Sequence, residues 1–239
     1  MLKSILVKTV ITSLMLGSFS ASANVVVDLF SDNQGLLQVV GTSASSSAAG
    51  PDIIGGERDI QVIAGNDVRA SAEVLNGSLL IASSALNPQN PTADDMFSVE
   101  VQWDGLDNSS DLALPPAGLA PAVDFSTLSG FSATINSSDG AGFFAVTLHD
   151  TNNESAVLNL AFIPVSPLAP ATFSIPFAFF TGLNPALDLS SIAAVVLKLS
   201  SSGDTDISVD AISAVPTPSS LAVLGLGLLG FAGFARRKA

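Results

Sequence analysis

Few side chains in this chain have the chemistry of a catalyst. The single histidine, His149, stands before Asp150 at the expected end of a strand, and no Gly-x-Ser-x-Gly sequence supplies a nucleophile for it to activate. A glycosidase needs two opposed carboxyl groups, one with a raised pKa, and no spacing marks such a pair among the acidic residues. The residue types therefore predict that the protein is not an enzyme.

The acidic residues are better suited to holding a metal ion. Carboxylate oxygens are the hard ligands that Ca²⁺ prefers, whereas zinc sites take several His or Cys ligands and the chain has one His and no Cys. The alternative is that each Asp caps a turn and keeps the surface soluble. Two groups of aspartates lie in expected turns: Asp104, Asp107 and Asp111, and Asp204, Asp206 and Asp210.

The aromatic residues offer no clear platform for sugar stacking. Such a platform uses exposed Trp or Tyr, and the chain has one Trp and no Tyr. Alternation along the segment 99–103 places Trp103 on the same face as Val99 and Val101. We therefore expect Trp103 and the Phe side chains to pack in the core.

The elements that position these residues are expected to be short strands. Segments rich in Val, Ile, Phe and Thr alternate with Gly, Asn, Asp, Ser and Pro, and Pro or Gly interrupts every candidate amphipathic helix. The clearest unit is a hairpin in which Asn76-Gly77 joins strands at 68–75 and 78–82. Further strands are expected at 25–30, 36–40, 59–63, 97–103, 130–135, 143–149, 155–162, 172–175, 192–200 and 206–212, with loops at 41–50 and 114–121. The fold class predicted is all-β, a single β-sandwich of the jelly-roll type.

The charge balance excludes one class of partner. Between positions 24 and 215 the basic residues are Arg58, Arg69 and Lys198, whereas all 21 Asp and Glu lie in this region. Such a surface repels polyanions and attracts cations, so nucleic acid is not an expected partner.

The N-terminus has the layout of a secretory signal peptide. Lys3 and Lys8 precede a short apolar stretch, which ends in the small residues Ala21-Ser22-Ala23. The apolar stretch is shorter than the roughly 20 residues of a permanent membrane helix. We predict a signal peptide at 1–23 and cleavage after Ala23, and hence an exported protein with its β-sandwich domain at 24–214.

The C-terminus has the layout of a membrane-retention signal. A Pro-x-Pro segment precedes the apolar stretch 221–235, and the basic end 236–238 follows it. The apolar stretch can enter the bilayer as a transmembrane helix while the cations hold the end of the chain in the cytoplasm. The alternative to a processed signal is an ordinary anchor that is never cut.

The segment 215–239 resembles the PEP-CTERM sorting signal. The residues that match the family pattern are Val215, Pro216, Pro218, Ser219, Arg236, Arg237 and Lys238, together with the Gly-rich apolar stretch. Thr217 stands where the family usually has Glu. The resemblance implies cleavage near the Pro-x-Pro motif by an exosortase-type processing protease, a transient stay in the inner membrane, and delivery to the cell surface or extracellular matrix of a bacterium that makes exopolysaccharide.

A looser resemblance concerns the domain at 24–214. Its first segment, 26–32, and its last, 206–212, are similar to those of galactose-binding-like jelly rolls, a group that includes many carbohydrate-binding modules. In that group the first and last strands are neighbours and often contribute to a structural Ca²⁺ site. The resemblance implies Asp28 and Asp210 as the metal ligands.

Three functions remain open from the sequence. The first is a non-catalytic surface or matrix protein whose acidic β-sandwich associates with exopolysaccharide or a biofilm. The alternative is a carbohydrate-binding module, and a further alternative is a polysaccharide-active enzyme.

Overall fold

The computed structural model describes residues 24–86, 96–110, 112, 118–202 and 204–216. The predicted signal peptide at 1–23 and the apolar stretch at 221–235 lie outside the described residues, as do Pro218, Arg236, Arg237 and Lys238. In the part of the chain that is described, no helix has the length and apolar character needed to cross a membrane.

Alternation of apolar and polar residues produces the predicted strands, because successive side chains of a strand point to opposite faces. The strands are β1 (Val25–Asp28), β2 (Gln34–Val40), β3 (Ser43–Ala49), β4 (Glu57–Ala64), β5 (Val68–Leu75), β6 (Ser78–Ala85), β7 (Met96–Trp103), β8 (Leu128–Ser138), β9 (Gly142–Asp150), β10 (Ser155–Phe162), β11 (Ala171–Pro176), β12 (Ile192–Ser202) and β13 (Asp206–Pro216). Two short 3-10 turns, η1 (Ile54–Gly56) and η2 (Leu189–Ser191), and the helix α2 (Phe177–Leu183) complete the described elements.

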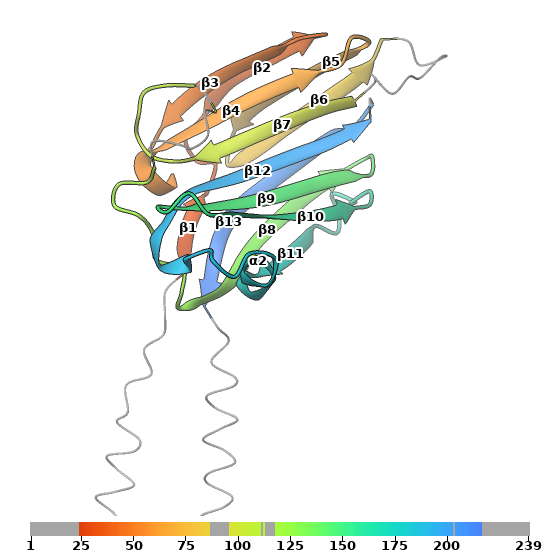
Figure 1. The fold of residues 1–239 in the computed structure, drawn as a ribbon. Helices are drawn as coiled ribbons and strands as arrows, with labels where there is room; N and C mark the ends of the chain where they lie inside the picture. Colours follow the sequence, from red (N-terminus) through yellow and green to blue (C-terminus); the bar gives the residue numbers. More distant parts are fainter. Residues whose placement is uncertain (1–23, 87–95, 111, 113–117, 203, 217–239) are drawn as a thin grey trace, which may run out of the picture. The chain divides into compact units, whose positions relative to one another are not determined.

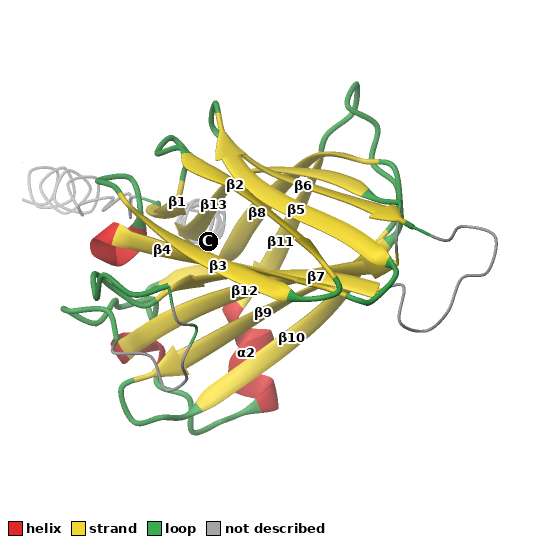
Figure 2. Ribbon diagram, turned by 90° about the horizontal axis from the view of Figure 1, so that it is seen from above, coloured by secondary structure: helices red, strands yellow, loops and turns green. Residues whose placement is uncertain are grey.

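The strands form two stacked antiparallel sheets (Figures 1 and 2). Sheet A has the order β11-β8-β13-β6-β5-β2, with β1 pairing β13, and sheet B has the order β10-β9-β12-β7-β4-β3. One continuous core of Val, Ile, Leu, Phe and Ala lies between them, and Trp103 is fully buried in it. The predicted all-β, two-sheet fold and the buried position of Trp103 are confirmed.

The hairpin at β5 and β6 is also confirmed. Its register pairs Leu75 with Ser78, and Asn76 and Gly77 have φ values of 53° and 82°. A two-residue turn requires positive φ at both positions, which Asn and Gly tolerate best. The turn chemistry therefore fixes which residues of β5 and β6 lie side by side.

One expectation from the sequence was wrong. The Ser/Ala-rich segment predicted as a loop contains β3, which pairs with β4 from Ser43–Ile63 to Ala49–Glu57 at the edge of sheet B. The segment after β11 forms α2, whose Phe177 and Phe180 are buried against Phe131. For β3, pairing with β4 overrides a weak local preference for the strand conformation.

Gly130 gives a test of how closely neighbouring strands of sheet A approach each other. It lies in β8 between β11 and β13, and a Cβ added to it would clash with the backbone oxygen of Ile175. We expect Gly130→Ala to lower the free energy of unfolding by about 1–3 kcal/mol, the usual cost of overpacking. Gly35→Ala in β2 is the control, because no heavy atom lies within 4 Å of its added Cβ. Urea unfolding measures both, and equal stabilities would contradict the close approach of β8 and β11.

Candidate functional site

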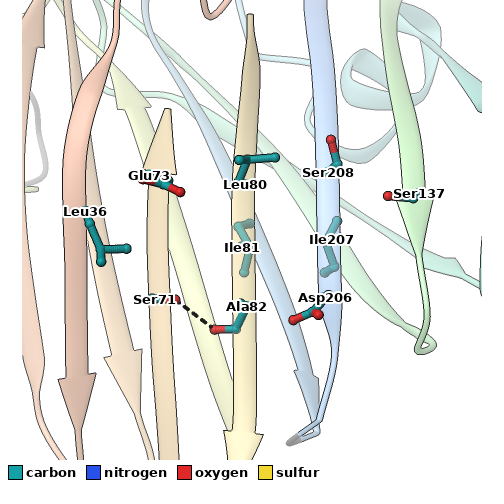
Figure 3. Close-up of a pocket in the computed structure, with 10 residues that line it drawn as sticks. All are labelled: Leu36, Ser71, Glu73, Leu80, Ile81, Ala82, Ser137, Asp206, Ile207 and Ser208. Carbon is teal, nitrogen blue, oxygen red and sulfur yellow. Dashed lines mark hydrogen bonds between the residues drawn. The ribbon is translucent and has the colours of Figure 1, made fainter. Parts of the chain in front are cut away.

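An open groove crosses the outer face of sheet A (Figure 3). It has a volume of about 320 Å³ and draws side chains from β2, β5, β6, β8 and β13. The register sets two rows across these strands, because Ala82 pairs with both Ser71 and Asp206, and Leu80 pairs with both Glu73 and Ser208. Sequence-distant residues thus share one surface.

The groove combines acidic, hydroxyl and aliphatic side chains. Glu73 and Asp206 contribute carboxylates, and the hydroxyl groups come from Ser71, Ser137 and Ser208. Leu36 and Leu80 also line the groove, and Leu36 is 59% exposed. Burial, and secondly the charge of Asp139, raise the pKa of Asp206 above its ordinary value. The face can therefore accept hydrogen bonds from a hydroxyl-rich ligand while its aliphatic carbons rest on leucine.

The sequence did not single out this groove. Glu73 and Asp206 are separated by more than a hundred positions, and only the pairing of β5, β6 and β13 brings them to one face. The available signal was the polar alternation of Ser71 and Glu73 against Ala72 and Val74 in β5. That pattern marks an outward face without indicating what binds there.

Asp28, predicted as a calcium ligand, is the centre of a buried hydrogen-bond network. Its Oδ2 accepts hydrogen bonds from Arg58 Nη1 at 2.8 Å and from Trp103 Nε1 at 2.9 Å, and its Oδ1 accepts one from the backbone N of Phe30 at 2.7 Å. Arg58 also donates to Gln34 Oε1. Both members of the Asp28–Arg58 salt bridge are 0% exposed. Both oxygens of the Asp28 carboxylate therefore accept hydrogen bonds from groups of the protein itself.

The first and last strands are neighbours, as the jelly-roll resemblance implies. Asp28 lies opposite Ile212 in the β1–β13 ladder, two positions from the half-buried Asp210. Within the described residues, no three His, Asp or Glu side chains gather into a group able to hold a metal ion. Calcium binding by Asp28 and Asp210 stays a prediction, and the contacts of Asp28 weigh against it.

Other predicted residues have local roles. Asp107 Oδ1 accepts a hydrogen bond from Ser109 N and so caps a local turn, whereas Asp204 Oδ1 accepts one from Ala85 N at the end of β6. His149 is half-buried near the end of β9, and burial lowers its pKa despite the opposing charge of Asp150. Asp111 lies outside the described residues.

Two residues of the predicted sorting motif belong to the domain. Val215 and Pro216 end β13, opposite Gly130 and Leu128, and their carbonyl oxygens each accept a hydrogen bond from Ser129 Oγ at 3.0 Å. The last strand therefore includes the first proline of the Pro-x-Pro segment.

The fold and the groove define a class, a two-sheet β-sandwich with an open polar face on one sheet. No protein-family model matches the chain, and no curated protein matches it. Among solved structures, the family 11 carbohydrate-binding module of the cellulosomal cellulase Lic26A-Cel5E of Clostridium thermocellum is similar at 16% identity and a TM-score of 0.41, over 83% of this chain and 97% of that chain.

Two further solved structures have comparable similarity. A family 30 carbohydrate-binding module shares 14% identity at a TM-score of 0.41, over 82% of this chain and 100% of that chain. An exo-β-agarase shares 12% identity at a TM-score of 0.40, over 82% of this chain and 25% of that chain. Similarity at this level does not identify a ligand or an activity for this chain.

Proposed function

We propose that this protein is a non-catalytic carbohydrate-binding module that holds a polysaccharide across the groove of sheet A. The observation that carries the proposal is the groove itself, in which two carboxylates, three hydroxyl groups and two leucines from five strands form one open surface. Of the three functions that the sequence leaves open, a carbohydrate-binding module makes the most direct use of this surface. Many consecutive strands, such as β7 and β8, lie in different sheets, and this connectivity supports a β-sandwich of the jelly-roll type.

The chemistry of the groove suits sugars. Carboxylate acceptors form charge-assisted hydrogen bonds with ligand hydroxyl groups, and such bonds are the stronger ones in protein recognition. Leu36 and Leu80 provide an aliphatic surface for the C–H faces of a sugar ring. Because Glu73 and Asp206 are acidic, we expect neutral glycans to bind better than uronic-acid polymers.

The location that we propose follows from the termini. A signal peptide at 1–23 would export the chain, and the PEP-CTERM-like segment at 215–239 would hold it in the inner membrane until an exosortase-type protease releases it. At the cell surface or in the extracellular matrix, the domain would meet exopolysaccharide. Binding of exopolysaccharide in the groove is then the molecular function of this surface protein.

Isothermal titration with neutral polysaccharides selected on a glycan array tests the groove. We expect Glu73→Gln with Asp206→Asn to weaken the best ligand at least about tenfold, because each lost charge-assisted hydrogen bond is worth about 1.5–3 kcal/mol. The matched control is Glu100→Gln with Asp52→Asn, which removes the same charges outside the groove. Binding that is absent in the full-length protein, or equal in both double variants, would refute the proposal.

A further inference from the structure

A second, separate cluster of acidic and amide side chains lies at one end of sheet B. Asp59 of β4 lies opposite Gln102 of β7 in the ladder. Gln102 Nε2 donates a hydrogen bond of 2.8 Å to Asp104 Oδ2. Asp59, Gln102 and Asp104 are 1%, 0% and 2% exposed. The three side chains therefore form one connected, buried group.

This group is on the outer face of the sheet, close to the described residues that follow β7. Asp59 alternates with the core residues Ile60 and Val62, and shares its face with Ile63, which is 38% exposed. The loop after β7 is attached beside the cluster, because the buried Glu57 accepts hydrogen bonds at Oε2 from the backbone N of Asp107 at 2.8 Å and of Asn108 at 2.9 Å.

Three oxygens of the group lack a hydrogen-bond donor. Among the residues that the structure describes, no donor reaches Asp59 Oδ1, Gln102 Oε1 or Asp104 Oδ1, and all three atoms are buried. The amide of Gln102 already directs its nitrogen toward Asp104, so its oxygen is the free end. Native proteins rarely leave buried acceptors unsatisfied, and three in one place point to a bound partner that the described side chains do not provide.

No basic side chain provides that partner. In the described part of the chain the two salt bridges are Arg58–Asp28 and Lys198–Glu100, and neither involves Asp59 or Asp104. Burial, followed by the charges of Asp104, Glu57 and Asp107, raises the pKa of Asp59 to about 8. The described residues thus place two carboxyl groups together in a buried position without a basic side chain to balance them.

We propose that Asp59, Gln102 and Asp104 bind a Ca²⁺ ion at the end of sheet B, where β7 ends. The side-chain ligands of the ion are two carboxylates and one amide oxygen, and this site does not require a third acidic side chain. These are hard oxygen ligands, which Ca²⁺ accepts in irregular geometry together with backbone oxygens or water. Mg²⁺ keeps several of its own waters in an octahedral shell, which a buried cluster accommodates less well. The ion balances the two carboxylates and joins Asp59 of β4 to Gln102 of β7 and to Asp104, which directly follows β7.

The site does not depend on the groove, which is on the other sheet. It also differs from the pair Asp28 and Asp210, because Asp28 is held by Arg58 and Trp103. Loss of the groove's ligand would leave Ca²⁺ binding intact.

Terbium luminescence tests the site in the full-length protein. Tb³⁺ replaces Ca²⁺ and emits when a nearby Trp is excited, and the chain has one Trp and no Tyr, so emission arises only next to Trp103, between Gln102 and Asp104. We expect sensitised emission that Ca²⁺ displaces, and a rise in melting temperature of about 5–10 °C at a hundredfold excess of Ca²⁺ over its Kd.

Substitutions of single aspartates test where the ion binds. Asp59→Asn and Asp104→Asn should each abolish the emission and the Ca²⁺-dependent rise in melting temperature, whereas Asp210→Asn should keep both. Circular dichroism confirms that each variant is folded. No emission and no Ca²⁺-dependent melting shift in the unmodified protein would overturn the proposal, and so would a loss of emission in Asp210→Asn that Asp59→Asn does not share.

Discussion

Arg58→Met is expected to lower the free energy of unfolding by about 3–5 kcal/mol. The substitution leaves the Asp28 carboxylate, which is 0% exposed, without its positive partner inside the protein. Removing one member of a buried salt bridge strands the other as an uncompensated charge, and this accounts for most of the loss. Arg58 also donates to Gln34 Oε1 and to the carbonyl oxygen of Asp32, so two further acceptors lose their donor.

Urea unfolding followed by Trp103 fluorescence measures this effect. Trp103 shares Asp28 Oδ2 with Arg58, so its emission reports on the network directly. Lys198→Met is the matched control, because the Lys198–Glu100 pair is 3.6 Å apart and Lys198 is 46% exposed. An exposed pair contributes about 0–1 kcal/mol. Equal losses in the two variants would contradict the isolation of Asp28 and Arg58 from solvent.

A second substitution separates charge from packing. Adding Asp28→Asn to Arg58→Met removes the stranded charge, and we expect it to restore part of the lost stability. A double variant no more stable than Arg58→Met would show that packing of the Arg58 side chain, which lies 5.5 Å from the ring centroid of Phe30, is what the protein loses.

The strands were predictable because their information is local. In β5 the alternation from Val68 to Val74 gives the inward face directly, and Asn76-Gly77 gives the turn and hence the register with β6. β3 was not predictable in this way. Its Ser and Ala residues have little preference for strands, and the segment is a strand because β4 offers it an open edge.

The sites were harder to predict because they depend on pairing between distant strands. Asp28 was recognised as a special residue, but its partners Arg58 and Trp103 come from β4 and β7, which only the stacking of the sheets brings to it. The sequence predicts Asp104 in a turn, where an aspartate is a candidate metal ligand. It predicts Asp59 only as the first residue of a strand, with nothing that marks it as part of a site. Register across β4 and β7 is what joins Asp59 to Gln102.

When Ca²⁺ is removed with EGTA, we expect the free energy of unfolding to fall as the pH rises, because of the buried carboxyl group of Asp59. Its pKa is about 8 in the folded protein and near 3.8 in the unfolded chain. Between these values the folded state holds a proton that the unfolded state releases, so the contribution of Asp59 to stability is complete below about pH 3.8 and is lost as the pH rises toward 8. One such proton gives a slope of up to about 1.4 kcal/mol per pH unit.

Asp59→Asn removes this proton, and the variant therefore isolates its effect. His149 titrates in the same range in the opposite direction, since its lowered pKa makes the folded state lose stability as the pH falls. Subtracting the variant's profile from that of the unmodified protein cancels His149. The expected difference is a gain in relative stability of Asp59→Asn at every step from pH 5 to pH 8, measured by urea unfolding, whereas Asp52→Asn, an exposed carboxyl, should change nothing. Parallel profiles for Asp59→Asn and the unmodified protein would mean that Asp59 is already ionised when folded, and that the buried cluster tolerates its charge without a cation.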